Sequence, residues 1–211
     1  MLAPLYLLLG LLGVLALAML AWRLGSRRRS LPCQVWLRWM VELENPFAKT
    51  LRSECIVRYL EVRPGMTVLD IGCGPGRVTI PVARAVGPQG QVVAIDLQPG
   101  MLRRAQEKAQ AANLSNIRFV QAGLGDGKLD AGPADRALLV TVLGEIPNQE
   151  GALKEIFAAL KPGGLLSVTE TVFDPHYQRR DTVTQLAGAA GFREKAFFGN
   201  WAAYTLHLQK P

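Results

Sequence analysis

Cysteine and histidine are scarce in this chain of 211 residues, which has three cysteines and two histidines. Cys33, Cys55 and Cys73 lie far apart and form no CxxC pair, so neither a disulfide framework nor a tetrahedral zinc site is expected. An odd number of scattered thiols is typical of a reducing compartment. The sequence therefore predicts a protein without a bound metal.

Acidic residues are absent before Glu42, and the net charge of +7 is unevenly distributed. Four arginines between residues 23 and 29 account for much of it, and the remaining 20 basic and 17 acidic side chains leave a balance of +3. Nucleic-acid-binding domains carry basic side chains spread over one folded face. The composition therefore argues against a nucleic-acid partner.

Residues 2–22 form a run of 21 residues without a charged side chain. A helix of that length spans about 31 Å, close to the thickness of the hydrocarbon core of a bilayer. A cleaved signal peptide is the alternative, but no basic residue precedes the run and arginines follow it directly. We expect a single transmembrane anchor within residues 1–30, with the N-terminus outside and the rest of the chain cytoplasmic, because arginines are retained on that side.

Residues 31–49 link this anchor to the remaining chain and are rich in apolar side chains, including Trp36 and Trp39. A helix in this linker either lies on the membrane surface, where tryptophan is favoured, or packs over the mouth of the domain's own site. The two interpretations are compatible, and the sequence does not decide between them.

Residues 50–211 alternate between strand-like and helix-like segments. Apolar runs rich in β formers predict strands at residues 67–71, 91–96, 117–121, 136–140 and 165–170. Helices are predicted at residues 50–60, 77–86, 99–112, 148–160 and 182–190. Two further strand-like runs, 192–198 and 203–209, are joined by a short connection and should pair antiparallel. The pattern predicts one α/β domain with a mostly parallel sheet covered on both faces.

A glycine-rich loop, Asp70-Ile71-Gly72-Cys73-Gly74-Pro75-Gly76, follows the first predicted strand. Its alternating glycines let the backbone approach a ligand closely. Asp96 ends the second strand, 20 residues beyond Gly76, where a carboxylate can accept both hydroxyls of a ribose. Counting from Gly72, a dinucleotide fingerprint would need glycine or alanine where this chain has Arg77. The acid at position 70 would repel a diphosphate and suits a ligand that carries an ammonium and a sulfonium, so an NAD-dependent oxidoreductase is the weaker alternative.

These features, together with the Leu-Lys-Pro-Gly-Gly stretch before the fifth predicted strand, resemble the class I S-adenosylmethionine-dependent methyltransferases over about residues 50–211. The resemblance implies a Rossmann-like three-layer sandwich, in which a seven-stranded, mostly parallel sheet has an antiparallel last strand. It also implies S-adenosylmethionine as the cofactor. The residues that it assigns to cofactor binding are Asp70, Gly72, Cys73, Gly74 and Gly76 around the methionine moiety, Asp96 on the ribose and Leu97 beside the adenine.

The chain departs from the family where many members carry an acid that meets the adenine amino group. Gly123 occupies that place, and the backbone amide of Leu124 is expected to serve the ring. Asp126, three residues beyond Gly123, is either a substitute for the acid or a solvated turn residue.

The methyl acceptor is expected at the loops after the fourth and fifth predicted strands, at the carboxyl edge of the sheet. Thr141, where the fourth strand ends, is counted with the cofactor-binding candidates. Glu145 and His176 are the favoured catalytic candidates, as orienting or proton-accepting groups. Their structural alternatives are an acid at the start of a helix and an ordinary loop residue. Other polar residues available after the fifth strand are Glu170, Asp174 and Tyr177.

The predicted function is membrane-anchored methyl transfer to a hydrophobic small molecule or lipid-like acceptor, either a phospholipid amine or a quinone-type compound. The tether supports this prediction, because a domain held at a bilayer meets lipid-soluble acceptors within the membrane plane. A non-catalytic, membrane-tethered interaction protein that retains the fold is an alternative from a different class.

Overall fold

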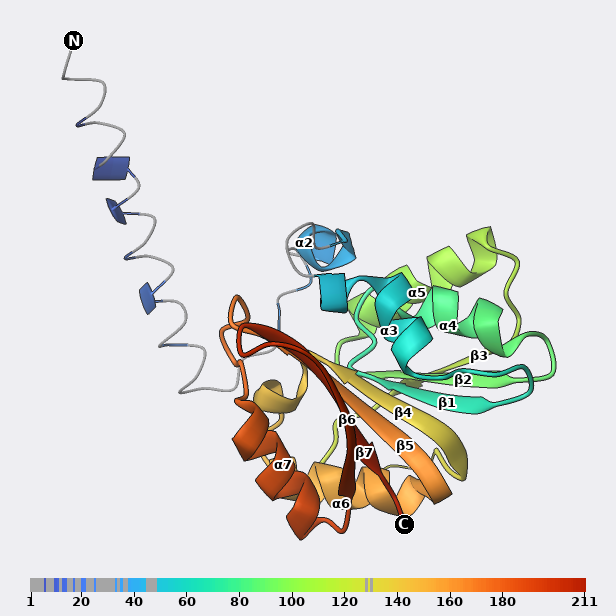
Figure 1. Cartoon of the computed structure of the whole chain (residues 1–211). Coiled ribbons are helices and arrows are strands. Elements are labelled where there is room, and N and C mark those ends of the chain that lie inside the picture. The colour runs from blue at the N-terminus through green and yellow to red at the C-terminus, as the bar shows by residue number, and fades with distance from the viewer. Residues whose placement is uncertain are drawn as a thin grey trace.

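A seven-stranded sheet in the order β3-β2-β1-β4-β5-β7-β6 forms the centre of the computed structural model (Figure 1). Strand β7 lies antiparallel between β5 and β6, and the other neighbouring strands are parallel. The predicted seven-stranded sheet with an antiparallel last strand is therefore confirmed. The strands are β1 (Thr67–Ile71), β2 (Gln91–Asp96), β3 (Ile117–Gln121), β4 (Ala134–Val140), β5 (Leu160–Thr171), β6 (Arg193–Gly199) and β7 (Ala203–Gln209).

The structure describes residues 49–127, 129 and 131–211, and before them Cys33, Val35, residues 38–44 and scattered positions between 6 and 25. Most of the predicted membrane anchor at residues 2–22 falls outside these residues. Among the residues described, none belongs to a helix with the length and apolar character needed to cross a membrane.

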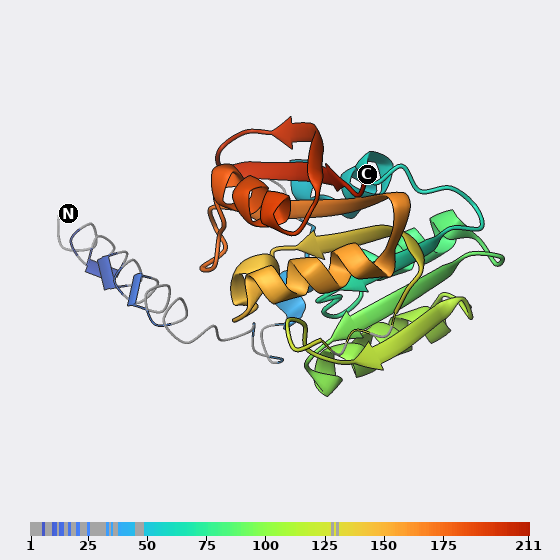
Figure 2. The same ribbon diagram turned by 90° about the horizontal axis from the view of Figure 1, so that it is seen from below.

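Helices cover both faces of the sheet, which completes the predicted three layers (Figures 1 and 2). One face carries α3 (Ser53–Tyr59), α4 (Thr79–Val86) and α5 (Pro99–Ala111), and the other carries α6 (Gln149–Ala159) and α7 (Arg180–Ala189). Successive side chains of a strand point to opposite faces. Leu138 of β4 accordingly belongs to the apolar core that includes residues of α3 and α4, and Leu139 to the core that includes residues of α6 and α7.

Some predicted boundaries are wrong, and the differences have local causes. The predicted helix at residues 50–60 is divided into a 3-10 turn, η2 (Lys49–Leu51), and α3, because Arg52 between them has extended backbone. The helix predicted from residue 77 begins at Thr79. Strand β4 begins at Ala134, and β5 includes residues 161–164, which the sequence predicts as a turn. Pairing of Ala134 with Leu160, followed by a register shift, draws both segments into the sheet.

Strand β1 pairs with β2 on one side and with β4 on the other. The strand order therefore reverses at β1. In open α/β sheets, ligands bind at the carboxyl ends of the strands where the strand order reverses. The loops that follow β1, β2, β4 and β5 meet at this edge, and they carry the predicted site residues.

Candidate active site

The glycine loop after β1 has a backbone conformation that residues other than glycine rarely adopt. The φ angles are +65° at Gly72, +52° at Gly74 and +78° at Gly76. A Cβ at Gly72 would collide with Val142, and one at Gly76 would lie 3.0 Å from the Cβ of Ala105. At Gly74 the nearest described atom outside the loop would be 3.8 Å away. Packing therefore explains why residues 72 and 76 are glycine, and the loop leaves room for a ligand beside Gly74.

Asp96 holds the glycine loop against the start of α5. Its Oδ2 accepts a hydrogen bond from the backbone N–H of Gly74 at 2.9 Å, and its Oδ1 accepts one from the N–H of Gln98 at 2.8 Å. Burial raises the pKa of this carboxyl group, and the two hydrogen bonds oppose that shift. Each carboxylate oxygen has a second acceptor site, so Asp96 can organise the loop and still accept from the hydroxyls of a ribose.

Asp70 and Cys73 lie under or within the loop and are both buried. The Thr79 hydroxyl donates to Oδ2 of Asp70 at 2.5 Å, which joins β1 to α4. Burial raises the pKa of Asp70 to about 6 and raises that of the Cys73 thiol as well. The backbone N–H of Cys73 donates to the carbonyl of Ile95 at 3.0 Å. Direct contact of these side chains with a methionine moiety stays a prediction.

The two residues expected beside the adenine lie close together. Leu97 follows β2 and is 58% exposed. A Cβ added at Gly123, in the loop after β3, would lie 3.7 Å from Cδ1 of Leu97. The missing side chain at position 123 therefore leaves one side of Leu97 uncovered, next to the half-buried Leu124. Asp126 is exposed in the same loop.

Thr141 has a strained backbone at the end of β4. Its φ of +56° lies in the left-handed region, which is unusual for a β-branched residue. The backbone N–H donates to the carbonyl of Thr169 at 2.8 Å, and the hydroxyl donates to that of Val140 at 2.7 Å. Such strain persists only where surrounding structure enforces it, and it is concentrated at functional sites. The turn at Thr141 directs the chain into η3 (Leu143–Glu145).

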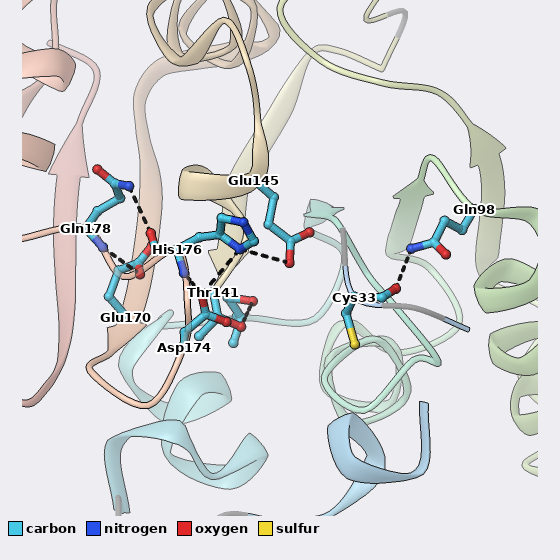
Figure 3. A network of polar contacts seen from close by, with 9 residues as sticks. Cys33, Gln98, Thr141, Glu145, Glu170, Asp174, His176 and Gln178 are labelled. Carbon is cyan, nitrogen blue, oxygen red and sulfur yellow. Dashed lines mark hydrogen bonds and ion pairs between the residues drawn. The ribbon is translucent and has the colours of Figure 1, made fainter. Parts of the chain in front are cut away.

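The structure brings the two predicted catalytic residues together (Figure 3). Nδ1 of His176 lies 3.9 Å from Oε1 of Glu145 and 3.9 Å from Oδ1 of Asp174. His176 is 6% exposed, and neither of its ring nitrogens has a hydrogen-bond partner among the described residues. A Cβ at Gly144 would collide with the carbonyl oxygen of His176, so this glycine allows η3 and the loop after β5 to approach.

Negative charge and burial dominate the electrostatics around this pair. Burial, then the charges of Asp174 and Asp96, raises the pKa of Glu145 to about 8, although a backbone hydrogen bond from Cys33 opposes the shift. Glu170 is 1% exposed, and burial raises its pKa well above the ordinary value. Its Oε2 accepts from the N–H of Gln178 at 3.2 Å, whereas Oε1 has no described hydrogen-bond partner. This cluster of acidic side chains favours a ligand that carries positive charge or donates hydrogen bonds.

An N-terminal strap, made of Cys33, Val35 and α2 (Arg38–Glu42), crosses this edge of the sheet. The Cys33 backbone donates to Glu145 and accepts from Nε2 of Gln98 at 2.8 Å, and thereby connects the loops after β4 and β2 (Figure 3). Cγ1 of Val35 would lie 2.8 Å from a Cβ at Gly100, at the start of α5. Residues of the predicted 31–49 linker thus pack over the domain's own site. The contact of this linker with a membrane surface stays a prediction.

Glu42 attaches the strap to α5. Its carboxylate oxygens lie 2.8 Å from Nε and 3.2 Å from Nη2 of Arg104, and Oε2 lies 3.2 Å from Nζ of Lys108. These cations hold the pKa of Glu42 below its usual range. Release of this attachment would uncover the glycine loop, because Val41 of α2 lies beside Gly74.

We expect Glu42→Ala to accelerate dissociation of S-adenosylmethionine about two- to five-fold, because exposed ion pairs contribute only modestly to stability. Hydrogen exchange at the amides of α2 should accelerate in the same variant. Glu107→Ala is the matched control, since Glu107 also contacts Arg104 but lies on α5 itself, and no ion pair joins it to the described residues of the strap. Stopped-flow measurement of dissociation tests this prediction, and equal rates for the two variants would contradict it.

Packing of the linker over the site was one of the two interpretations of the sequence, but the particular contacts of the strap and of Val142 were not predicted. Gln98 and Cys33 are 65 residues apart, and the hydrogen bond uses a backbone carbonyl that every residue has. Val142 is one apolar residue among many. The sequence holds no signal for either contact, apart from the apolar character of residues 31–49.

Comparison with known proteins agrees with this geometry. Residues 68–164 match a family model described as a methyltransferase domain. A demethylmenaquinone methyltransferase of Staphylococcus carnosus is 36% identical over 129 residues, which cover 58% of this chain and 53% of the relative. The chain thus spans about half the length of the curated relatives that it matches.

Two solved structures show the same fold. A SAM-dependent methyltransferase from Aquifex aeolicus matches with a TM-score of 0.74 and 20% identity, over 85% of this chain and 100% of that one. Magnesium protoporphyrin IX methyltransferase from Synechocystis PCC 6803, solved with bound SAM, matches with a TM-score of 0.66 and 19% identity, over 83% and 91% of the two chains.

The sheet order, the glycine loop and the acid that ends β2 give this chain the Rossmann-like α/β fold of the solved methyltransferases. The match of residues 68–164 to the methyltransferase-domain model and the similarity to known methyltransferases support a SAM-dependent methyltransferase. The predictions of enzyme class and cofactor are confirmed at the level of this domain.

Proposed function

We propose that this protein transfers methyl groups from S-adenosylmethionine to a hydrophobic, quinone-type acceptor at a membrane. The observation that carries the proposal is the half-buried Glu145 beside the buried His176, at the same sheet edge as the glycine loop and Asp96. The curated relatives are demethylmenaquinone methyltransferases, which supports a quinone-type acceptor.

The residues present fit S-adenosylmethionine better than a dinucleotide. Asp70, Asp96, Glu145 and Glu170 all have raised pKa values, chiefly because they are buried. A diphosphate would place more negative charge beside these acids, whereas the positive charges of a sulfonium and an ammonium would offset the negative charge of the acids. Gly74 would border the methionine moiety of the cofactor, Asp96 would accept from the ribose hydroxyls, and Leu97 would lie along the adenine.

Bound S-adenosylmethionine supplies a methyl group on a positively charged sulfur, and its transfer leaves a neutral thioether. The new bond forms at an oxygen or ring carbon of the acceptor, which loses one proton. Glu145 takes that proton in our proposal, because a base with a pKa of about 8 lies close to the pKa near 10 of a phenolic hydroxyl. His176 orients the acceptor or passes the proton on, and its burial keeps bulk water from one side of Glu145.

A second acceptor class is favoured by the acidic character of the site. Glu145, Glu170 and Asp174 lie around His176, and an ammonium group would offset their charge. A phospholipid amine is therefore the second candidate. It shares with a quinone the requirement for loss of a proton and for a hydrophobic body.

Membrane association belongs to the same proposal, with residues 2–22 as a single anchor, the N-terminus outside and the domain on the cytoplasmic side. The absence of charge from this run and the four arginines that follow it support this orientation. The domain does not cover the large apolar side chains that are described within this run. Each is more than half exposed: Tyr6, Leu11, Val14, Leu17 and Leu20.

Methyl transfer to a total lipid extract tests the function. We expect the full chain with isotopically labelled S-adenosylmethionine to produce a lipid that is heavier by 14 daltons plus the mass of the label. This lipid should be found among the quinones for the first candidate and among the amine phospholipids for the second. Glu145→Gln is the matched control for catalysis at this site. Label in neither fraction would contradict the proposal and favour a non-catalytic interaction protein.

A further inference from the structure

Two large aromatic side chains stand exposed at the carboxyl edge of the sheet, outside the site described above. Phe173 is 72% exposed and Trp201 is 78% exposed. Thr171 of β5 pairs with Ala203 of β7, and the N–H of Val172 donates to the carbonyl of Ala202 at 2.8 Å. Phe173 follows Val172 and Trp201 precedes Ala202, so both aromatic residues lie at the same end of β5 and β7.

Hydrogen bonds hold the backbone around both residues. The Tyr177 hydroxyl donates to the carbonyl of Trp201 at 2.5 Å, and Oδ1 of Asn200 accepts from the N–H of Ala202 at 2.9 Å. The N–H of Asp174 donates to the carbonyl of Thr171 at 3.0 Å. Single exposed apolar residues are common on protein surfaces, but a fixed pair of large aromatic residues at one tip indicates a contact surface.

The chain before the domain indicates which surface they meet. Trp22 ends the uncharged run, and Cys33 lies at the carboxyl edge against Glu145 and Gln98. Eleven peptide units separate Trp22 from Cys33 and span at most about 40 Å. Whatever receives the uncharged run therefore lies within about 40 Å of Cys33, which packs at the sheet edge that also carries Phe173 and Trp201.

We propose that Phe173 and Trp201 form a second membrane contact, inserted at the boundary between headgroups and acyl chains of a lipid bilayer. Aromatic rings prefer this depth. Asp174, next to Phe173, lies 3.9 Å from His176, so the contact turns the acceptor side of the site toward the lipid. A lipid-soluble acceptor then reaches Glu145 and His176 without crossing water. This inference rests on the proposed function, because it concerns the route of a hydrophobic acceptor.

Depth-dependent fluorescence quenching tests the contact. Trp22→Phe, Trp36→Phe and Trp39→Phe together leave Trp201 as the only tryptophan of the full chain. In vesicles of phosphatidylcholine and phosphatidylglycerol with brominated acyl chains, its emission should shift to shorter wavelength and fall by roughly half or more relative to unbrominated vesicles. Emission unaffected by bromine would overturn the proposal. A dimer in detergent that Phe173→Ser with Trp201→Ser converts to a monomer, without quenching by bromine, would assign the pair to self-association instead.

Kinetics separate this inference from the function on which it rests. The double variant Phe173→Ser/Trp201→Ser should raise KM for a long-chain quinol embedded in vesicles by about ten-fold, a change of about 1.4 kcal/mol. Its kcat with a short-chain, water-soluble quinol and its affinity for S-adenosylmethionine should stay unchanged. An unchanged KM in vesicles contradicts the membrane contact alone. A wild-type protein that is inactive on both quinols contradicts the proposed function instead.

Discussion

Replacing Asp96 with asparagine is expected to lower the affinity for S-adenosylmethionine by about 100-fold. The carboxylate already accepts from the backbone N–H groups of Gly74 and Gln98, one on each oxygen. An asparagine keeps one acceptor oxygen and turns an N–H₂ group toward the other backbone donor. The variant therefore loses the ribose acceptors and displaces the glycine loop at the same time. Isothermal titration calorimetry measures the change.

Asp181→Asn is the matched control for this prediction. Asp181 is an exposed acid at the start of α7, so this variant makes the same chemical change outside the glycine loop and the loops expected around the adenine. We expect its affinity to stay within two- to three-fold of the wild type, as is usual for surface substitutions. An Asp96→Asn protein that remains folded by circular dichroism and binds with unchanged affinity would refute the placement of the ribose.

Glu145→Gln should lower kcat by about 100-fold or more, which is the usual contribution of a positioned general base. A glutamine keeps the oxygen that accepts from the Cys33 backbone, so the strap should stay in place. The side chain no longer takes a proton from the acceptor. S-adenosylmethionine affinity should change little, and single-turnover kinetics with saturating cofactor would show the loss. A variant with wild-type kcat would assign Glu145 a structural role.

The pH dependence of the reaction distinguishes the base from a merely structural acid. Glu145 has a pKa of about 8 and acts as a base only when ionised. For the wild type, kcat/KM should therefore rise about ten-fold per pH unit below pH 8 and level off above it, since kcat/KM reports ionisation of the free enzyme. Glu145→Gln should lack this limb. Asp174→Asn should move it to lower pH, because the charge of Asp174 contributes to the raised pKa.

Strand positions at the site were largely predictable from the sequence. Strands β1, β2, β3 and β7 begin and end at the predicted residues, because each is a short apolar run rich in β formers. The predicted strand at residues 165–170 lies within β5, but its start at Leu160 was not predicted. Pro162-Gly163-Gly164 is typical of a turn, and only the pairing of Leu160 with Ala134 of β4 draws that segment into the sheet. The local preferences of a segment do not determine which distant strand it pairs with.

The meeting of Glu145 and His176 follows from strand order. Both residues come shortly after neighbouring parallel strands, β4 and β5, whose carboxyl ends lie at one edge of the sheet. The strain at Thr141 and the particular contacts of the strap had no comparable signal. A left-handed threonine is disfavoured by local preference, and the strap is held by a backbone group of Cys33 and by Glu42, which is 62 residues from Arg104.

The central claim is that the glycine loop and Asp96 bind an adenosine joined to a sulfur-bearing amino acid. Calorimetric titration of the full chain in detergent with S-adenosylhomocysteine, and separately with NAD, tests it most directly. The account predicts one-to-one binding of S-adenosylhomocysteine and no heat of binding for NAD. Binding of NAD alone, or of neither compound, would contradict it.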